Sequence, residues 1–332
     1  DPLDLIDKYG ADGVRVGMLL CAPAGGDLLF DESLPEQGRN FTTKMWNAFK
    51  LVKTWEIADI AQPQHSALAL TWFENVINKA KETLNTQFEQ YRISEALMTV
   101  YTTFRDEFSS WLLEIIKPAY GQPIDRKTYE KTLDLFAELL QLLHPFMPFI
   151  TEEIWQNLKE RKTGESIMVS VINNDTPYDE NLLKEFEFVK EIIVGIRNIR
   201  KQNNIAFKDR LELKVKKNDR YPAAFASIVE KMGNISATET VTEAVKGAWS
   251  FIVDTVEYFI PGTGNVDTAE VKAKLEEELK YTRGFLKSVI AKLSNERFVS
   301  GAPEQVVANE RKKQADAEAK IAAIETQLAE LK

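Results

Sequence analysis

Two runs of regularly spaced residues near the end of the chain restrict its fold more than any other feature. Steps of four and three alternate through Val271, Leu275, Leu279, Thr282, Leu286, Val289 and Leu293, and again through Ala317, Ile321, Ile324, Leu328 and Leu331. This spacing keeps a stripe on one side of a helix, and Gly301-Ala302-Pro303 interrupts the helix between the runs. Residues 266–332 are therefore predicted to form an antiparallel coiled-coil hairpin whose arms each reach about 40 Å. Because such a hairpin pairs with itself, a monomer is favoured over a dimer formed through the coiled coil.

Long helices are also predicted between residues 34 and 175. One apolar stripe of helical period consists of Phe41, Met45, Ala48, Phe49 and Val52. Further helices are expected to begin near Ser66, Ile93, Asp125 and Thr151. The connections between them are short, which is typical of an antiparallel helix bundle.

The remaining segments are less regular. Residues 1–33 suggest a short helix, a strand-like run and turns, and are interpreted as the C-terminal tail of a missing domain. The sequence from Ile167 to Val171 also resembles a strand. Residues 176–265 are predicted to form a small α+β junction unit, with its clearest strand at Leu211–Lys216 and others near 235–241 and 248–260. The fold class is therefore mainly α.

The distribution of charge is more informative than its total. The formal net charge is −9, which argues against a nucleic-acid partner. Residues 190–217, however, hold nine Lys or Arg against three Asp or Glu, and residues 279–313 hold eight against three. Two basic segments can bind RNA if they line one surface, although a solvated helix face gives the same pattern.

The residues that usually carry catalysis are scarce. Cys21 is the one cysteine, which excludes an internal disulfide and a multi-cysteine zinc site and favours a reducing, cytoplasmic compartment. The two histidines, His65 and His144, have no nucleophile or metal ligand at a recognisable spacing. No apolar run is long enough for a membrane span. The sequence predicts neither a catalytic residue nor a metal site.

Three motifs resemble one superfamily. Residues 8–15 with 26–32 look like the segment that follows the Lys-Met-Ser-Lys-Ser loop of class I aminoacyl-tRNA synthetases for branched aliphatic amino acids. Arg39-Asn40-Phe41 with Lys44-x-Trp46-Asn47-Ala48 resembles the first helix of their anticodon-binding bundle. Residues 143–155, Leu-His-Pro-Phe-Met-Pro-Phe-Ile-Thr-Glu-Glu-Ile-Trp, resemble a later helix of that bundle.

The end of the chain distinguishes among these enzymes. Residues 292–299 and 302–311 resemble the tip of the coiled-coil arm in the valyl-tRNA synthetase family. Many bacterial isoleucyl enzymes instead end in a cysteine-rich zinc module, which a single cysteine excludes. Two alternatives stay open: the C-terminal part of an isoleucyl- or leucyl-type synthetase, and a non-catalytic coiled-coil module that binds protein.

The resemblance implies that catalysis is carried out by a region outside these residues. Members of the family join valine to tRNA(Val) through an adenylate made from ATP, with Mg²⁺ in the catalytic domain. The His-Ile-Gly-His motif, the Lys-Met-Ser-Lys-Ser loop and an editing domain are missing from this sequence. The chain is therefore expected to begin after the last catalytic loop, to need no cofactor, to be inactive alone, and to work with N-terminal catalytic and editing domains.

An anticodon-binding face is predicted on the first bundle helix. Asn40, Lys44 and Asn47 share a side opposite the apolar stripe, and asparagine can pair with a base edge. Trp46 either stacks on a base or belongs to the core. The predicted anticodon-binding residues are Arg39, Asn40, Lys44, Trp46, Asn47 and Lys50.

A second set of cations is predicted to contact the tRNA backbone. By resemblance, the arm touches the outer corner of the tRNA, where contacts to phosphate add affinity more than discrimination. The predicted residues toward the tip of the arm are Lys280, Arg283, Lys287, Lys292, Arg297, Lys312 and Lys313. The set also includes Arg197, Arg200 and Lys201, on the helix before the α+β unit, which either bridge the bundle and the tRNA stem or are ordinary surface charges.

Overall fold

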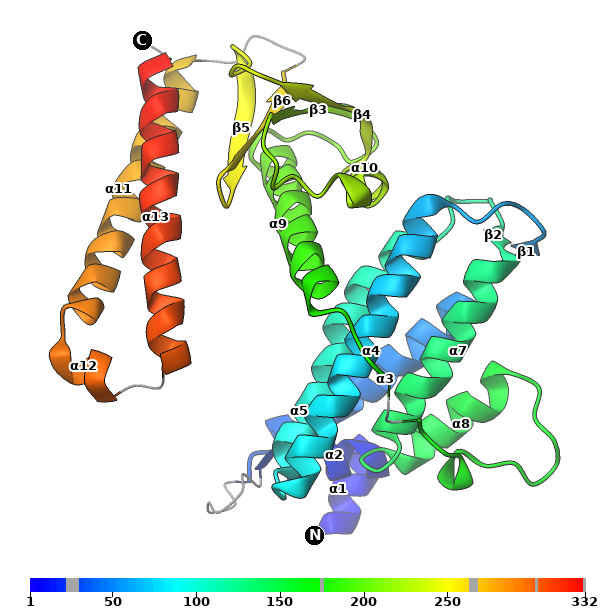
Figure 1. Cartoon of the computed structure of the whole chain (residues 1–332). Coiled ribbons are helices and arrows are strands. Elements are labelled where there is room, and N and C mark those ends of the chain that lie inside the picture. Colours follow the sequence, from blue (N-terminus) through cyan, green and yellow to red (C-terminus); the bar gives the residue numbers. More distant parts are fainter. Residues whose placement is uncertain (22–29, 174–175, 263–267, 302–303, 331–332) are drawn as a thin grey trace. The chain divides into compact units, whose positions relative to one another are not determined.

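The chain folds into two compact units, residues 1–186 and 187–332 (Figure 1). The structure is a computed structural model and describes residues 1–21, 30–173, 176–262, 268–301 and 304–330. The predicted domain limits at residues 33, 175 and 265 are finer than this division and stay predictions. No helix in the described part of the chain is long and apolar enough to cross a membrane.

The first unit is a bundle of helices. Its main helices are α1 (Pro2–Tyr9), α2 (Ala11–Cys21), α3 (Ser33–Lys53), α4 (Gln64–Glu89), α5 (Ile93–Thr102), α7 (Arg126–Leu143) and α8 (Pro148–Leu158). A π-helix, η1 (Thr103–Leu112), and the short α6 (Leu113–Ile116) continue α5. The short strands β1 (Ile57–Ala58) and β2 (Ile124–Asp125) pair in parallel, and α9 (Glu180–Gln202) begins in this unit. The predicted bundle is confirmed.

Aromatic side chains form the centre of the bundle. Phe73, Phe104, Phe108 and Phe136 are fully buried, and the rings of Phe108 and Phe136 lie 4.8 Å apart. The stripe predicted on α3 is buried as well, with Phe41 2% exposed and its ring 4.4 Å from that of Tyr101. Burial of rings of this size is the largest stabilising contribution that a helix bundle can make.

The start of the chain differs from the prediction. Residues 2–21 form two helices, so the strand-like run expected there is wrong. They pack against α3, where a Cβ added to Gly38 would lie 2.5 Å from the carbonyl oxygen of Gly13. Arg15 donates to the carbonyl oxygens of Phe146 and Pro145, at 3.0 and 2.9 Å. The described part of this segment therefore packs as part of the first unit. Residues 22–29, which hold part of one motif, lie outside the description.

The strand predicted at residues 167–171 is also wrong. Ile167–Val169 is a 3-10 turn, η2, and the side chains of Met168 and Val169 are more than 70% exposed. Ser166 caps the turn by accepting from the backbone N–H of Met168. A short apolar run adopts a strand only where a neighbouring strand pairs with it, and sequence alone does not show the partner.

The second unit contains a four-stranded sheet. It consists of β3 (Leu211–Lys216), β4 (Ile235–Val241), β5 (Ala248–Val253) and β6 (Val256–Pro261) in the order β4-β3-β6-β5, with η3 (Ala223–Phe225) and α10 (Ala226–Gly233) before β4. β3 pairs in parallel with β4 and antiparallel with β6. Leu211, Leu213 and Val215 are buried while their neighbours are more exposed, as the alternation predicts. The predicted α+β unit is confirmed.

The end of the chain is a helical hairpin, as predicted. Its elements are α11 (Thr268–Leu293), α12 (Glu296–Gly301) and α13 (Glu304–Glu330), and α11 packs along α13 (Figure 1). Val289 and Ile324, both members of the two runs, are 1% and 2% exposed. We refer to residues 268–330 as the arm.

Candidate RNA-binding surfaces

The outer face of α3 carries the three residues that the spacing placed together. Asn40 and Asn47 are exposed and Lys44 is half-buried, while Phe41 and Met45 face the core. The separation follows from the helical period, because positions i, i+4 and i+7 share one side. The predicted geometry of this face is confirmed; that it reads an anticodon stays a prediction.

Two adjoining hollows run along this face and share Asn40 and Lys44. One has a volume of about 320 Å³, and its lining includes Glu36, Gln37 and Tyr101. The other, of about 310 Å³, is lined by Asn47 and, across from α3, by Ser109 of η1 and Glu114 of α6. The two asparagine amides offer donors and acceptors along this groove, which are the groups that hydrogen-bond to the edges of splayed bases.

Sequence reasoning missed the far wall of this groove. The far wall consists of Tyr101, Ser109 and Glu114, which follow Lys44 of α3 by more than fifty residues, and no local motif marks them. Ser109 belongs to the ten-residue π-helix. Long π-helices are rare and occur mostly at functional sites, but i→i+5 pairing gives no signal in the hydrophobic pattern.

The other three predicted anticodon residues lie on a neighbouring side of α3. Arg39, Trp46 and Lys50 recur at steps of seven and four, and none of them lines the two hollows. Arg39 donates to the carbonyl oxygen of Lys8 at 3.2 Å. The half-buried ring of Trp46 lies 5.1 Å from that of Phe49, so Trp46 is neither a core residue nor a fully exposed platform.

Arg39 also borders a larger hollow of the bundle, of about 680 Å³, which holds several ionisable groups. Asp12 accepts from the backbone N–H groups of Phe149 and Ile150, yet burial raises the pKa of its carboxyl. Burial likewise lowers the pKa of His144, whose Nδ1 lies 2.7 Å from Thr151 Oγ1. These groups cap and join helices, and no three His, Cys, Asp or Glu side chains of the described residues could hold a metal ion.

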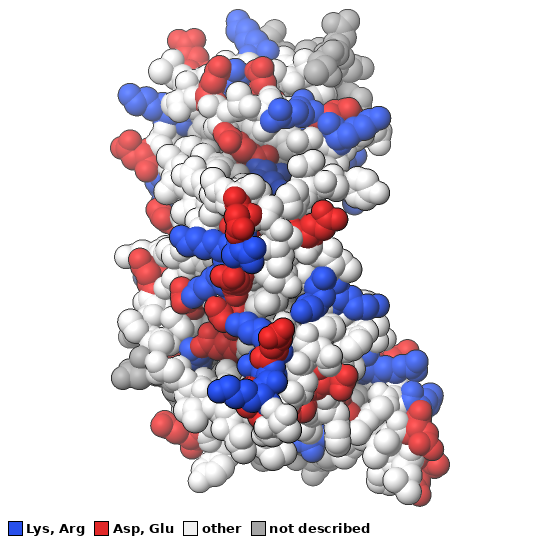
Figure 2. Space-filling view, turned by 90° about the vertical axis from the view of Figure 1, so that its right-hand side faces the viewer, with Lys and Arg blue, Asp and Glu red and all other residues white. Residues whose placement is uncertain are grey.

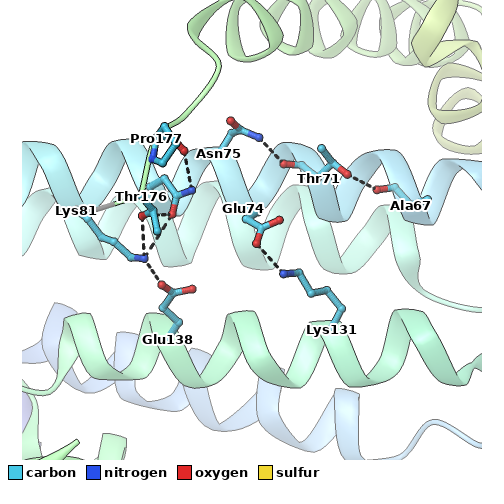
Figure 3. Close-up of polar contacts among 10 residues, drawn as sticks. Ala67, Thr71, Glu74, Asn75, Lys81, Lys131, Glu138, Thr176 and Pro177 are labelled. Atoms are coloured by element: carbon cyan, nitrogen blue, oxygen red, sulfur yellow. Dashed lines mark hydrogen bonds and ion pairs between the residues drawn. The ribbon is translucent and has the colours of Figure 1, made fainter. Parts of the chain in front are cut away.

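A buried lysine forms a second feature that the sequence did not suggest. Lys81 on α4 is 2% exposed and pairs with Glu138 on α7, as Figure 3 shows. Its ammonium also donates to the carbonyl oxygen of Asn173 at 3.0 Å. Nearby, Asn78 donates to the carbonyl oxygen of Pro177 at 3.1 Å. These bonds fix the segment that leads into α9 onto the bundle.

Arg200 was predicted to contact the tRNA backbone, and the structure contradicts this. Its side chain is 5% exposed and donates to the carbonyl oxygens of Gly233, Asn234 and Ala206. A cation that is buried, and whose three nitrogens all donate to backbone carbonyl groups, cannot reach a phosphate. The neighbouring Arg197 and Lys201 are exposed, as the prediction requires.

The predicted cations of the arm fall into two groups. Arg283 pairs with Glu325 at 2.5 Å, and Lys292 and Lys313 lie 3.8 and 2.6 Å from the buried Glu310. These pairs join or stiffen the helices, and the Lys313 hydrogen bond lowers the pKa of the Glu310 carboxyl. Among the predicted cations, Lys280, Lys287 and Lys312 are exposed and form no ion pair with any described residue. The side chain of Arg297 lies outside the description.

Opposite charges are interspersed on the face of the molecule drawn in Figure 2. Figure 2 shows one face on which Lys and Arg side chains lie among Asp and Glu side chains rather than in one broad basic area. Many of the pairs are local, such as Lys131 with Glu74 at 2.7 Å on the bundle. A Lys or Arg that already pairs with a carboxylate of the protein is less available to an RNA phosphate, so the unpaired cations are the better candidates for RNA contacts.

Two family models match the chain. The anticodon-binding domain of tRNA ligase covers residues 71–216, and the valyl tRNA synthetase tRNA binding arm covers residues 267–332. Together with the bundle and the arm, these matches define the class: this is the anticodon-binding and tRNA-arm portion of a tRNA ligase. Helix α3, which carries the predicted anticodon residues, precedes both matched ranges.

Relatives over the full length of the chain are more specific. Valine–tRNA ligases from Phocaeicola vulgatus, Parabacteroides distasonis and Enterococcus faecalis are 58%, 54% and 32% identical to it, and each alignment covers the whole chain. The chain belongs to the valine–tRNA ligase family. It spans 38–39% of the length of these relatives and matches their C-terminal part. Because the full-length relatives are valine–tRNA ligases, the isoleucyl and leucyl alternatives are not favoured.

Proposed function

We propose that this chain binds tRNA(Val) as a cytoplasmic monomer and holds it for a catalytic region outside these residues. The observation that carries the proposal is the match of the arm, residues 267–332, to the tRNA-binding arm of valyl-tRNA synthetase. The groove on α3 supports it, because amides and a half-buried lysine along one groove suit an unpaired anticodon loop.

The two surfaces would contribute differently. Lys280 and Lys287 are exposed and can meet phosphates, and such contacts add affinity that falls as salt rises. Asn40 and Asn47 can form hydrogen bonds to base edges, which discriminate between sequences. Valine, ATP and Mg²⁺ would be handled by the catalytic region, so valine-dependent ATP–pyrophosphate exchange by this chain is expected at background.

A filter-binding titration tests the proposal. The chain is titrated against a tRNA(Val) transcript and against random RNA of the same length, between about 50 and 200 mM salt. We expect preference for the tRNA and a steep loss of affinity with salt. Equal binding of both RNAs without a salt slope would contradict the proposal and would favour a module that binds protein.

A further inference from the structure

The loop between α9 and β3 is held rigidly by Arg200. The guanidinium donates to the carbonyl oxygen of Ala206 at 2.9 Å and to that of Gly233 at 2.9 Å. Asn234 Nδ2 then donates to the carbonyl oxygen of Phe207 at 2.7 Å. The loop backbone is therefore bound at two successive residues by groups from α9 and from the end of α10.

Phe207 projects from this loop into solvent. Its side chain is 60% exposed, whereas Phe225 and Tyr258 of the same unit are 3% and 0% exposed. The guanidinium carbon of Arg200 lies 5.6 Å from the Phe207 ring centroid, which supports the ring from the protein side. A single exposed ring is common on protein surfaces, but a ring whose backbone is fixed on both sides offers a flat face on which a base can stack.

The charged residues close to Phe207 in the sequence are mostly cations. Lys201, Lys208 and Arg210 are exposed and form no ion pair within the described parts of the chain. Asp209 is the one carboxylate in this stretch, and its backbone N–H bonds to Ala206. Three exposed cations within six residues of one exposed ring suit an unpaired nucleotide, whose base stacks on the ring and whose phosphates meet the cations. An apolar protein partner would need apolar neighbours around the ring.

We propose that Phe207, with Lys201, Lys208 and Arg210, forms an additional RNA contact that stacks an unpaired base. Arg200 is its positioning residue, which explains why a cation in a basic segment is buried. The inference rests on the proposed function, since it assumes that the chain binds RNA. It adds a stacking residue outside the α3 groove and outside the arm, in a loop where charge counting indicated only phosphate contacts.

The test measures binding of a fluorescently labelled tRNA(Val) transcript to the full chain. Phe207→Ala is expected to weaken binding roughly tenfold, within the range that base–aromatic stacking gives, and to leave the salt slope unchanged. Phe207→Trp should retain the affinity. The matched control is Tyr120→Ala, which removes a fully exposed ring from the bundle and should have no effect. Lys208→Met with Arg210→Met should reduce the salt slope by about 1.4 for two lost phosphates.

The outcomes separate this proposal from the proposed function. If the wild-type chain binds with a salt slope but Phe207→Ala binds equally well, the stacking contact is excluded and the proposed function stands. The same holds if Phe207→Trp is as weak as Phe207→Ala. If the wild-type chain does not bind the transcript, the proposed function fails and this contact fails with it. Because Phe207 is exposed, its variants should unfold at the wild-type temperature, which circular dichroism checks.

Discussion

The bundle of residues 1–186 and the arm of residues 268–330 are both helical, but different forces shape them. The bundle buries a cluster of aromatic rings, among them the fully buried Phe104, Phe108 and Phe136. The arm buries a narrow seam of small side chains such as Val289 and Ala317, and it adds ion pairs between its helices. The bundle is thus fixed by core packing, while the arm depends on its spacing pattern and its surface charges.

The space around individual glycines also differs between the bundle and the arm. In the bundle, a Cβ at Gly38 would meet backbone atoms of Gly13 at 2.5 and 2.9 Å, so α2 and α3 touch through their main chains. In the arm, a Cβ at Gly284 would meet nothing within 4 Å. Cations differ too: the bundle uses Arg15 and Lys81 to join its own helices, whereas the arm leaves Lys280 and Lys287 to solvent.

The largest expected effect tests the packing of the bundle. Phe108→Ala should lower the free energy of unfolding of the bundle by about 3–5 kcal/mol, because it removes a ring that three other rings contact. In the arm, Val289→Ala removes far fewer atoms and should cost much less. Chemical denaturation with a probe in each unit measures both. A loss under about 1 kcal/mol for Phe108→Ala would show that the aromatic cluster is not the core.

A buried and an exposed lysine should differ clearly. Lys81→Met leaves Glu138 without its partner and is expected to cost about 2–3 kcal/mol, less than for a fully enclosed pair because Glu138 is 28% exposed. The control is Lys131→Met, which breaks the exposed pair with Glu74 seen in Figure 3 and should cost under about 1 kcal/mol. Equal losses in urea denaturation would contradict the role given to Lys81.

The two glycines should respond in opposite directions. Gly38→Ala is expected to destabilise the bundle by about 1–3 kcal/mol, since backbone atoms cannot move aside without shifting a helix. Gly284→Ala should stabilise the arm by up to about 1 kcal/mol through helix propensity alone. Thermal unfolding followed by circular dichroism measures both, and a neutral Gly38→Ala would show that α2 and α3 are not in close contact.

Acid should weaken the bundle through His144. Burial lowers the pKa of the folded imidazole below 6.5, so the unfolded state binds a proton more readily as the pH falls below that value. The free energy of unfolding should therefore decline modestly between pH 7 and pH 5.5, and less in His144→Gln. The raised pKa of Asp12 acts in the opposite sense at lower pH, because its folded carboxyl takes up a proton first. An identical pH dependence in His144→Gln would contradict the burial of the imidazole.

Periodic features could be predicted from the sequence, and features that join distant segments could not. The helical stripe on α3, the strand β3 and the hairpin follow from spacing that is local in the chain. Arg200 is held in the interior partly by the carbonyl groups of Gly233 and Asn234, which lie more than thirty residues away in the sequence. No local sequence pattern indicates this pairing. The same holds for Lys81 with Glu138. Charge counts place cations in a segment, but only the fold decides which of them reach solvent.

The central claim is that the arm supplies affinity while the α3 groove supplies discrimination. Its most direct test is to measure the dissociation constants of two chain variants for tRNA(Val) and for the same tRNA with an altered anticodon, across a salt series. Lys280→Glu with Lys287→Glu should weaken binding of both RNAs equally and flatten the salt slope. Asn40→Ala with Asn47→Ala should remove the preference for the tRNA(Val) anticodon and leave the slope unchanged. Retained preference in the asparagine variant, or an unchanged slope in the lysine variant, would contradict the account.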